Sequence, residues 1–320
     1  MVRLRLPFYV CLSTHDSRLT SHDTHSLFSS YLPVVLHKST IQLLRFHFSL
    51  FLLPVYLFAL SQVENVNWTS AILVFIILHI LVYPSSNGYN SYMDRDTTPI
   101  GGLSNPMQPT RQLFQISVIM DIVAVSLSFA VSIFFSAGIL LYILASRTYS
   151  YRGIRLKKYP VLGYLVVVLF QGAETFYLTY HGCSEEKTLH VPLLPMIAAS
   201  LLIGGSYPLT QVYQHNEDLK DGVRTISYIL GKKGTFLYAG FIFALATLTM
   251  FFTFYRENNL HPFFIFLACM LPMVWFFIVW MRNVWRDETN ANFKNSFLMN
   301  LLASLSTTIC FLILILLKYV

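Results

Sequence analysis

The sequence predicts an all-α fold: a polytopic membrane protein built as a bundle of nine transmembrane helices. The 320-residue chain is 55% hydrophobic and only 12% charged, whereas a soluble globular domain carries about 25% charged residues. Its apolar residues fall in long segments, and one membrane crossing needs about 20 such residues. Basic residues gather in the loops on one side of these segments, which is typical of proteins that cross a membrane repeatedly.

Nine apolar segments make up one expected membrane domain, residues 37–320. The fourth is the shortest and weakest because polar residues begin at Ala145, but the charge pattern requires it. Residues 1–36 are rich in Ser, Thr and His and lack a long apolar run, so we expect a disordered tail or a start codon placed too early. The segments span residues 39–61, 68–90, 112–134, 137–149, 161–181, 191–213, 234–255, 260–281 and 295–318.

The basic residues predict the orientation in the membrane. The loops after even-numbered segments hold most of them, and the opposite loops hold only Lys187 and Arg256. Positive charge marks the cytoplasmic side, so we expect a cytoplasmic N-terminus and an integral protein of the cell inner membrane. The same bias accounts for the net charge of +7, and we expect no nucleic-acid partner. The four cysteines show no spacing typical of a disulfide framework or a metal site.

Two polar runs end apolar segments on the expected cytoplasmic side, at residues 87–96 and 213–221. Magnesium prefers oxygen ligands and is usually bound through one or two carboxylates plus substrate phosphates. The runs therefore predict a Mg²⁺ site that accepts a phosphorylated ligand, and the alternative is two solvated helix ends. The candidate metal ligands are Asn90, Asp94, Asp96, Glu217, Asp218 and Asp221.

Basic side chains near these runs could neutralise a diphosphate. The loop after the fourth segment offers Arg155, Lys157 and Lys158, and Arg224 follows the second acidic run. Arginine and lysine bind phosphate oxygens through charge-assisted hydrogen bonds. The alternative for most of these residues is that they only set the orientation in the membrane.

Three further charges lie inside apolar segments: Arg45, Asp121 and Glu174. A charge within a membrane span is costly and usually faces a cavity or a partner inside the bundle. We therefore expect Arg45 to face a cavity, and Asp121 and Glu174 either to pair within the bundle or to line a cavity.

These motifs resemble those of the UbiA family of intramembrane aromatic prenyltransferases. That family carries an NxxxDxxxD motif at the end of its second helix and a DxxxD motif after its sixth. Asn90 and Asp94 match the first part of the first motif. Asp218, followed by Gly222 and Thr225, matches the closing acid of the second. The resemblance covers residues 39–318 and implies the nine-helix fold.

The loop after the fourth segment extends the resemblance, because Tyr149-Ser150 and Leu156-Lys157-Lys158 match the family's basic loop. The chain departs from the family at two positions. Thr98 stands where the first motif has its third acid, and Gln214 stands where the second has its first acid. Asp96 and either Glu217 or Asp221 could replace them by a shift of register.

The resemblance implies an enzyme, a prenyltransferase that transfers a prenyl group from a polyprenyl diphosphate to a membrane-soluble acceptor. It implies Mg²⁺ as cofactor and an aromatic compound or quinone precursor as acceptor. The residues expected to act in catalysis are Asp94, Asp218, Lys157 and Arg45. Those expected to bind the diphosphate and its metal are Asn90, Asp94, Arg155, Lys158 and Arg224.

Two other functions remain open from the sequence. An inactive family member could bind a lipid or scaffold a partner, and the departures at Thr98 and Gln214 favour this alternative. An ion-coupled transporter could use polar groups within the membrane, but its site normally lies near the midplane. The acids of this chain gather at one end of the segments instead.

Overall fold

The computed structural model describes residues 3–4 and 34–319, so the expected tail, residues 1–36, lies almost entirely outside the described residues. A two-residue strand, β1 (Arg3–Leu4), pairs antiparallel with β2 (Val34–Val35). All other regular structure in the described part of the chain is helical. The predicted all-α fold is therefore confirmed.

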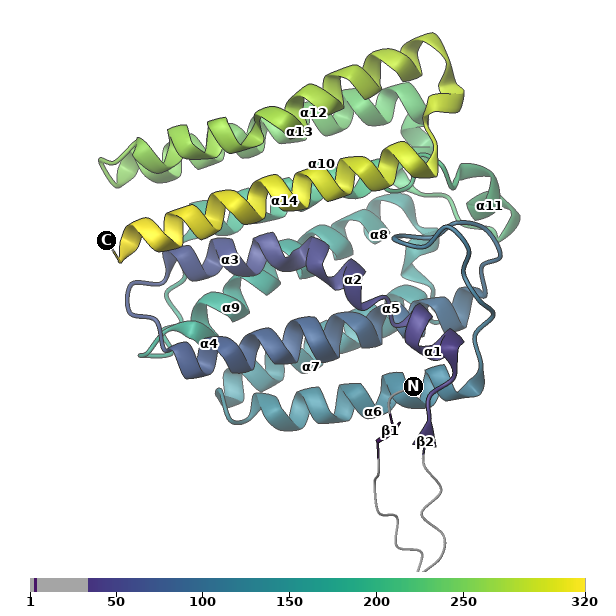
Figure 1. Ribbon diagram of the computed structural model, residues 1–320, viewed down its shortest axis with the longest axis horizontal. Helices are drawn as coiled ribbons and strands as arrows, with labels where there is room; N and C mark the ends of the chain where they lie inside the picture. The colour runs from purple at the N-terminus through teal and green to yellow at the C-terminus, as the bar shows by residue number, and fades with distance from the viewer. Residues whose placement is uncertain (1–2, 5–33, 320) are drawn as a thin grey trace, which may run out of the picture.

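Eight helical stretches of the described chain are long and apolar enough to cross a membrane. A ninth helix, α10 (Leu193–Leu209), lies within the predicted sixth segment and is shorter, at 17 residues. The helices lie side by side with similar axes, with α6 at one edge of the bundle and α12 and α13 at the other (Figure 1). This arrangement confirms the predicted multi-pass helical bundle.

Three spans are composite and five are each one helix, of which the sixth in order has a kink at Gly231, where φ is 67°. The single helices are α6 (Arg111–Ser128), α7 (Ile133–Ser150), α12 (Ile226–Arg256), α13 (His261–Arg286) and α14 (Phe293–Lys318). The first span joins α1 (Lys38–Leu43), α2 (Phe46–Ser49), η1 (Leu50–Leu52) and α3 (Leu53–Gln62). The second joins α4 (Trp68–Phe75), η2 (Ile76–Val82) and α5 (Tyr83–Asp94), and the fifth joins α8 (Pro160–Val167), η4 (Val168–Glu174) and α9 (Thr175–Cys183). Short helices in the connections are η3 (Leu156–Lys158), α11 (His215–Lys220) and η5 (Glu288–Asn290).

The fourth span is longer than predicted, because α7 has 18 residues and runs to Ser150. The side chain of Ser132 caps its start by accepting a hydrogen bond of 2.9 Å from the backbone N–H of Phe135. Its polar end stays helical because the polar side chains have partners on neighbouring helices. Arg147 pairs with Asp121 of α6, so these residues extend the helix instead of ending it.

Each of the three composite spans contains an irregularity. The first span breaks at Arg45, whose backbone is left-handed with φ 48°. The segments η2 and η4 are π-helical, and π-helical turns are frequent at functional sites. In η4, Gly172 packs so closely on α10 that an added Cβ would lie 2.5 Å from the Cα of Ser200.

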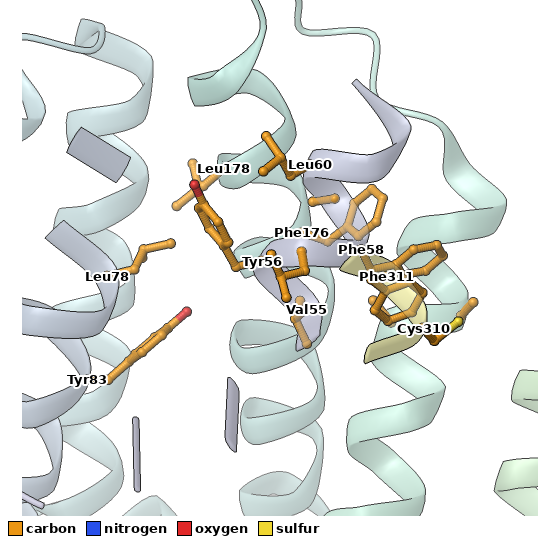
Figure 2. Packing of buried hydrophobic residues seen from close by; sticks show 14 of the residues in the cluster. Val55, Tyr56, Phe58, Leu60, Leu78, Tyr83, Phe176, Leu178, Cys310 and Phe311 are labelled. Carbon is orange, nitrogen blue, oxygen red and sulfur yellow. The ribbon is translucent and has the colours of Figure 1, made fainter. Parts of the chain in front are cut away.

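The core is rich in aromatic side chains, and its centre lies between α3, α9 and α14 (Figure 2). Phe58 of α3 stacks on Phe311 of α14, with ring centroids 4.5 Å apart, and meets Phe176 of α9 edge-on. Outside the bundle, large apolar side chains are exposed, such as Ile133 at 79% and Trp275 at 72%. A broad apolar exterior is expected where helices face lipid.

Candidate active site

A polar cavity lies at one end of the bundle, where α11 and the connection after α5 come together (Figure 1). Both acidic runs contribute side chains to its wall, together with basic residues from the first span and from the loop after α7. The predicted site residues that line this polar cavity are Arg45, Asn90, Asp94, Asp96, Lys157, Glu217, Asp218 and Asp221.

The end of α5 positions the first acidic run. The helix stops at Asp94 because Arg95 adopts a left-handed backbone conformation, with φ 56°. The chain turns there, so that Asp96 lines the polar cavity although it lies two residues after Asp94. Asn90 is fixed from α7, since its side-chain nitrogen donates a hydrogen bond of 2.9 Å to the hydroxyl of Ser150.

The short helix α11 positions the second acidic run. Glu217 and Asp218 occupy its first turn, where the partial positive charge of a helix N-terminus favours carboxylates. Gly222 follows with φ +69°, a left-handed conformation that glycine adopts without steric cost. The side chain of Gln214 donates a hydrogen bond of 3.3 Å to the carbonyl of Pro99. It thereby connects the second run to the loop that follows the first.

Two basic residues of the loop after α7 hold the acids together. The ammonium of Lys157 lies 2.5 Å from Oδ2 of Asp94. Arg155 pairs with Asp221, and one of its nitrogens lies 3.6 Å from Oδ1 of Asp94. One arginine therefore connects the first acidic run to the second. The side chain of Asp94 is only 5% exposed, so these contacts are only weakly screened by solvent.

Arg45 faces the polar cavity, as predicted for a charge inside a span. Its guanidinium donates to the carbonyl of Gly101 at 3.1 Å and to that of Asn87 at 3.2 Å. It also lies over the ring of Phe48, 5.3 Å from the centroid. These contacts tie the loop after the first acidic run to the end of the second span.

The structure does not bring every predicted residue to the wall of this cavity. Arg155 contacts two of its acids but does not line it. The ammonium of Lys158 lies over the ring of Tyr159, and Arg224 is exposed to the outside. Neither lines the polar cavity, so the structure adds no support for their expected contact with a diphosphate. Asp121 pairs with Arg147 inside the bundle. Both carboxylate oxygens of Glu174 are buried without a hydrogen-bond partner in the described chain.

Three uncharged residues of the cavity wall were missed as site residues by the sequence analysis. The hydroxyls of Tyr149 and Tyr207 share a hydrogen bond, and Gln211 lies one turn after Tyr207. Tyr149 had a signal, because it belongs to the Tyr-Ser pair that matches the family motif. Tyr207 and Gln211 had none, because they lie in a segment that was assigned only as a membrane span.

Buried oxygen atoms without hydrogen-bond donors show that the cavity fits a cation. Oδ1 of Asp94, Oδ2 of Asp218 and Oε1 of Gln211 are such atoms, counting partners within the described residues. No group of three His, Cys, Asp or Glu side chains in residues 3–4 and 34–319 could hold a metal ion by itself. This donor set suits Mg²⁺, which takes one or two carboxylates and completes its shell with water and phosphate oxygens.

The acids of the cavity are not all readily ionised together. Burial raises the pKa of Asp218 to about 7, with Lys157 opposing the shift and the neighbouring carboxylates adding to it. Burial and the charge of Asp94 raise the pKa of Asp96 to about 6. A divalent cation at this place would favour the ionised forms, because an opposite charge lowers the pKa of a carboxyl group.

Comparison with known proteins identifies the family. The sequence model of the UbiA prenyltransferase family matches residues 50–302, and the chain belongs to that family. The predicted resemblance is therefore confirmed. None of the curated proteins compared with the chain matches its sequence.

Solved structures share the fold. A UbiA homologue from Archaeoglobus fulgidus, bound to DMAPP and Mg²⁺, is 18% identical with a TM-score of 0.66, and the alignment covers 87% of this chain and 99% of that one. The same homologue bound to GPP and Mg²⁺ is 18% identical with a TM-score of 0.65 and the same coverage. The apo homologue from Aeropyrum pernix K1 is 17% identical with a TM-score of 0.65, covering 86% and 99% of the two chains.

Proposed function

We propose that this protein transfers a prenyl group from a polyprenyl diphosphate to a membrane-soluble acceptor in a Mg²⁺-dependent reaction. One observation carries the proposal: two acidic runs share a cavity in which buried carboxylate oxygens lack donors, beside cationic side chains. Membership in the UbiA family supports prenyl transfer in general. The homologue bound to DMAPP or GPP with Mg²⁺ supports the substrate class. The acceptor that we expect is an aromatic compound or quinone precursor.

The charged residues in and beside the polar cavity have roles in this proposal. Lys157 and Arg155 would turn from the carboxylates to the diphosphate oxygens, and Arg45 would keep the loop after the first run in place. Bound Mg²⁺ would supply neutralisation of the charge that develops on the leaving diphosphate. The residues that would hold it are Asn90, Asp94 and Asp218, with Asp96, Glu217 and Asp221 completing the oxygen-rich wall.

The remainder of the site would protect the reacting carbon. When the allylic C–O bond breaks, the bond electrons leave with the diphosphate and the prenyl group becomes a cation. The rings of Tyr149 and Tyr207 lie on the cavity wall, and aromatic faces attract cations. The apolar bundle around them excludes water, which would otherwise capture the cation. The acceptor then forms the new bond and releases a proton.

The prenyl tail has a place inside the bundle. A middle cavity shares Phe48, Gln171 and Tyr207 with the polar cavity. An apolar cavity shares Ile203 and Asn300 with the middle cavity. A substrate with its diphosphate in the polar cavity could therefore extend its tail through the middle cavity into the apolar one.

The distribution of charge supports a cytoplasmic active site and N-terminus in the cell inner membrane. The end of the bundle that holds the polar cavity also holds Arg152, Arg155 and Lys157. Basic loops of this kind remain on the cytoplasmic side during insertion. A diphosphate substrate made in the cytoplasm could then enter directly.

The alternative that the structure favours next is an inactive family member that binds a lipid. Gln214 stands in place of a family acid, and its side-chain amide donates a hydrogen bond to the carbonyl of Pro99. An ion-coupled transporter has less support, because the acids lie at one end of the bundle.

Binding of a substrate analogue tests the proposal without knowledge of the acceptor. The probe is a non-ionisable thio-analogue of geranylgeranyl diphosphate, measured on the purified protein with and without Mg²⁺, and then on Asp94→Asn. We expect binding that requires both the metal and Asp94. Glu185→Gln is the control, because it removes an exposed carboxyl group outside the polar cavity. No binding, or binding that is the same without Mg²⁺ and in Asp94→Asn, would favour the lipid-binding alternative.

A further inference from the structure

The short helix α11 carries the second acidic run, but none of its six residues is buried. A helix of this length is not stable by itself, and packing of its own side chains does not hold it in place. Its position therefore depends on polar contacts with neighbouring segments. Side chains in and beside α11 make such contacts: Gln214 with the carbonyl of Pro99, Asp221 with Arg155, and His215 with Ser227.

The contact of His215 is the one that a bound substrate would leave in place. In the proposed reaction Arg155 turns from its carboxylates to the diphosphate. Pro99 lies between two residues of the cavity wall, in a loop that meets the ligand itself. Ser227 instead belongs to the membrane-spanning helix α12 and is completely buried. His215 therefore connects α11 to the interior of the bundle.

The contact continues into α12 as a chain of three hydrogen bonds. Nε2 of His215 lies 2.8 Å from the hydroxyl of Ser227, and that hydroxyl lies 3.0 Å from the hydroxyl of Thr235. Thr235 donates a hydrogen bond of 2.7 Å to the carbonyl of Gly231. Because each hydroxyl has one hydrogen, Thr235 accepts from Ser227, and Ser227 accepts from Nε2–H of His215. The last acceptor thus fixes the direction of the whole chain.

This chain of hydrogen bonds also bridges the kink in α12. Gly231 has φ 67°, a left-handed conformation that glycine adopts without steric cost, so residues 226–230 form a separate first turn. Ser227 lies before the kink and Thr235 lies after it, and both are completely buried. A buried hydroxyl that loses its partner is costly. The chain therefore fixes the first turn of α12, and with it the partner of His215.

We propose that His215 is a positioning residue of the candidate active site, which fixes the rotation of α11 and thereby directs Asp218 into the polar cavity. The two residues are three apart and lie on the same side of the helix, and Asp218 lines the polar cavity. Oδ2 of Asp218 has no hydrogen-bond donor within the described residues, so that oxygen does not hold the side chain in place. The inference rests on the proposed function, because it takes Asp218 as a ligand of the metal.

Hydrogen–deuterium exchange of α11 tests the positioning without ligand or metal. The N–H of Asp218 donates to the carbonyl of Gln214 at 2.9 Å, and the N–H of Val223 donates to the carbonyl of Asp218 at 2.7 Å. His215→Phe keeps a ring beside Tyr228 but has no donor for Ser227. We expect exchange in residues 216–223 to become faster by about fivefold or more, because one stabilising hydrogen bond is lost.

Two amide variants separate the hydrogen bond from general packing. His215→Gln places an amide nitrogen at about the distance of Nε2 and should restore the native exchange rate. His215→Asn is too short to reach Ser227 and should exchange as fast as His215→Phe. Equal acceleration in the glutamine and phenylalanine variants would overturn the inference, because any substitution would then disturb α11.

Binding of the geranylgeranyl thio-analogue with Mg²⁺ tests the consequence for the site. His215→Phe should weaken binding by about fivefold or more, and His215→Gln should bind as the native protein does. Ser227→Ala should reproduce the loss, and its combination with His215→Phe should add little, since both remove the same contact. His190→Phe is the matched control, because it makes the same change at an exposed histidine between α9 and α10.

Two further results would overturn the inference. One is native exchange of α11 in His215→Phe, and the other is native affinity in this variant while the native protein binds the analogue only with Mg²⁺. Either result would leave the proposed function intact. If the native protein binds no analogue in a Mg²⁺-dependent way, the proposed function fails and the role of His215 in the site fails with it, whatever the exchange rates.

Discussion

Two clusters in this bundle are built from the same chemistry, carboxylates paired with basic side chains, yet they differ in completeness. In the first, Ser85 donates to one oxygen of Asp121 and Arg147 donates to the other. Arg147 also lies 4.1 Å from the ring centroid of Tyr89. In the second, at the polar cavity, Asp94 and Asp218 each keep a buried oxygen that receives no hydrogen bond from the described residues.

The difference is the one expected between a structural ion pair and the proposed binding site. A buried polar atom without a partner is costly, so nearly all of them are satisfied in folded proteins. The Asp121 cluster is closed and has no acceptor left for a ligand. The polar cavity has buried acceptors without donors, which a bound cation would satisfy. Variants of the two clusters should therefore have opposite effects on stability and on binding.

The largest effect on stability should come from Asp121→Ala. The change leaves the guanidinium of Arg147 without its ion pair in the interior, and breaking a buried pair costs about 3 kcal/mol or more. We expect a lower free energy of unfolding, measured by thermal or steric-trap unfolding in detergent. Molecules that remain folded should bind the prenyl thio-analogue as before. The double variant Asp121→Ala, Arg147→Met should recover part of the stability, and a loss of binding instead would contradict a purely structural role.

Asp218→Asn should have the opposite effects, weaker ligand binding without a loss of stability. Mg²⁺-dependent binding of the thio-analogue should weaken by about 100-fold, because a buried charge that contacts the ligand is removed. Stability without Mg²⁺ should stay the same or rise at pH 8, since burial raises the pKa of this carboxyl to about 7. Calorimetric titration and thermal unfolding of the same sample measure the two quantities. A large loss of stability with unchanged binding would mean that Asp218 has a structural role, like Asp121.

The pH should affect the free and the Mg²⁺-bound protein differently. Folding raises the pKa of Asp218 to about 7 and that of Asp96 to about 6, from an ordinary value of 3.8. Their contribution to stability is therefore complete below about pH 3.8 and is lost as the pH rises through 6 and 7. Metal binding instead requires the ionised forms. As the pH falls below these pKa values, Mg²⁺ affinity should weaken by about tenfold per pH unit for each proton that the metal must displace.

Unfolding curves from pH 5 to 8, with and without Mg²⁺, check this prediction. The stabilisation by Mg²⁺ should grow with pH, and titrations in two buffers of different ionisation enthalpy should show proton release on binding. Stabilisation that is independent of pH would mean that these two carboxyls do not contact the cation.

The smallest effect should come from Gln214→Asp, which restores an acid at a position where the family has one. A further carboxylate should tighten Mg²⁺, but the variant loses the hydrogen bond to Pro99, which contributes about 1 kcal/mol. We therefore expect a gain of less than tenfold in Mg²⁺-dependent binding. Binding that appears only in this variant would identify the native protein as the inactive family member.

The fold and the charged residues of the cavity wall could be predicted from the sequence because both depend on local signals. Apolar length and basic loops define the spans, and the spacing of Asn90 and Asp94 places them on one helix face. Which charges complete the wall depends on tertiary contacts that no local pattern contains. Lys157 and Lys158 are neighbours in sequence, yet only Lys157 lines the cavity. Tyr207 lies in a segment that signals only a membrane span.

The π-helical segment η2 lets the second span absorb one residue without moving the first acidic run. Ile76–Val82 precedes α5 in this span, and a π turn contains about one residue more than an α turn. Deleting a single residue there would convert the segment to regular α-helix and leave α5 on nearly the same face. A deletion between Tyr83 and Asn90 would instead rotate Asn90 and Asp94 by about 100° and take them off the cavity wall. Among relatives of this chain, an alignment gap within η2 is therefore compatible with an intact site, whereas a gap between Tyr83 and Asn90 indicates a lost one.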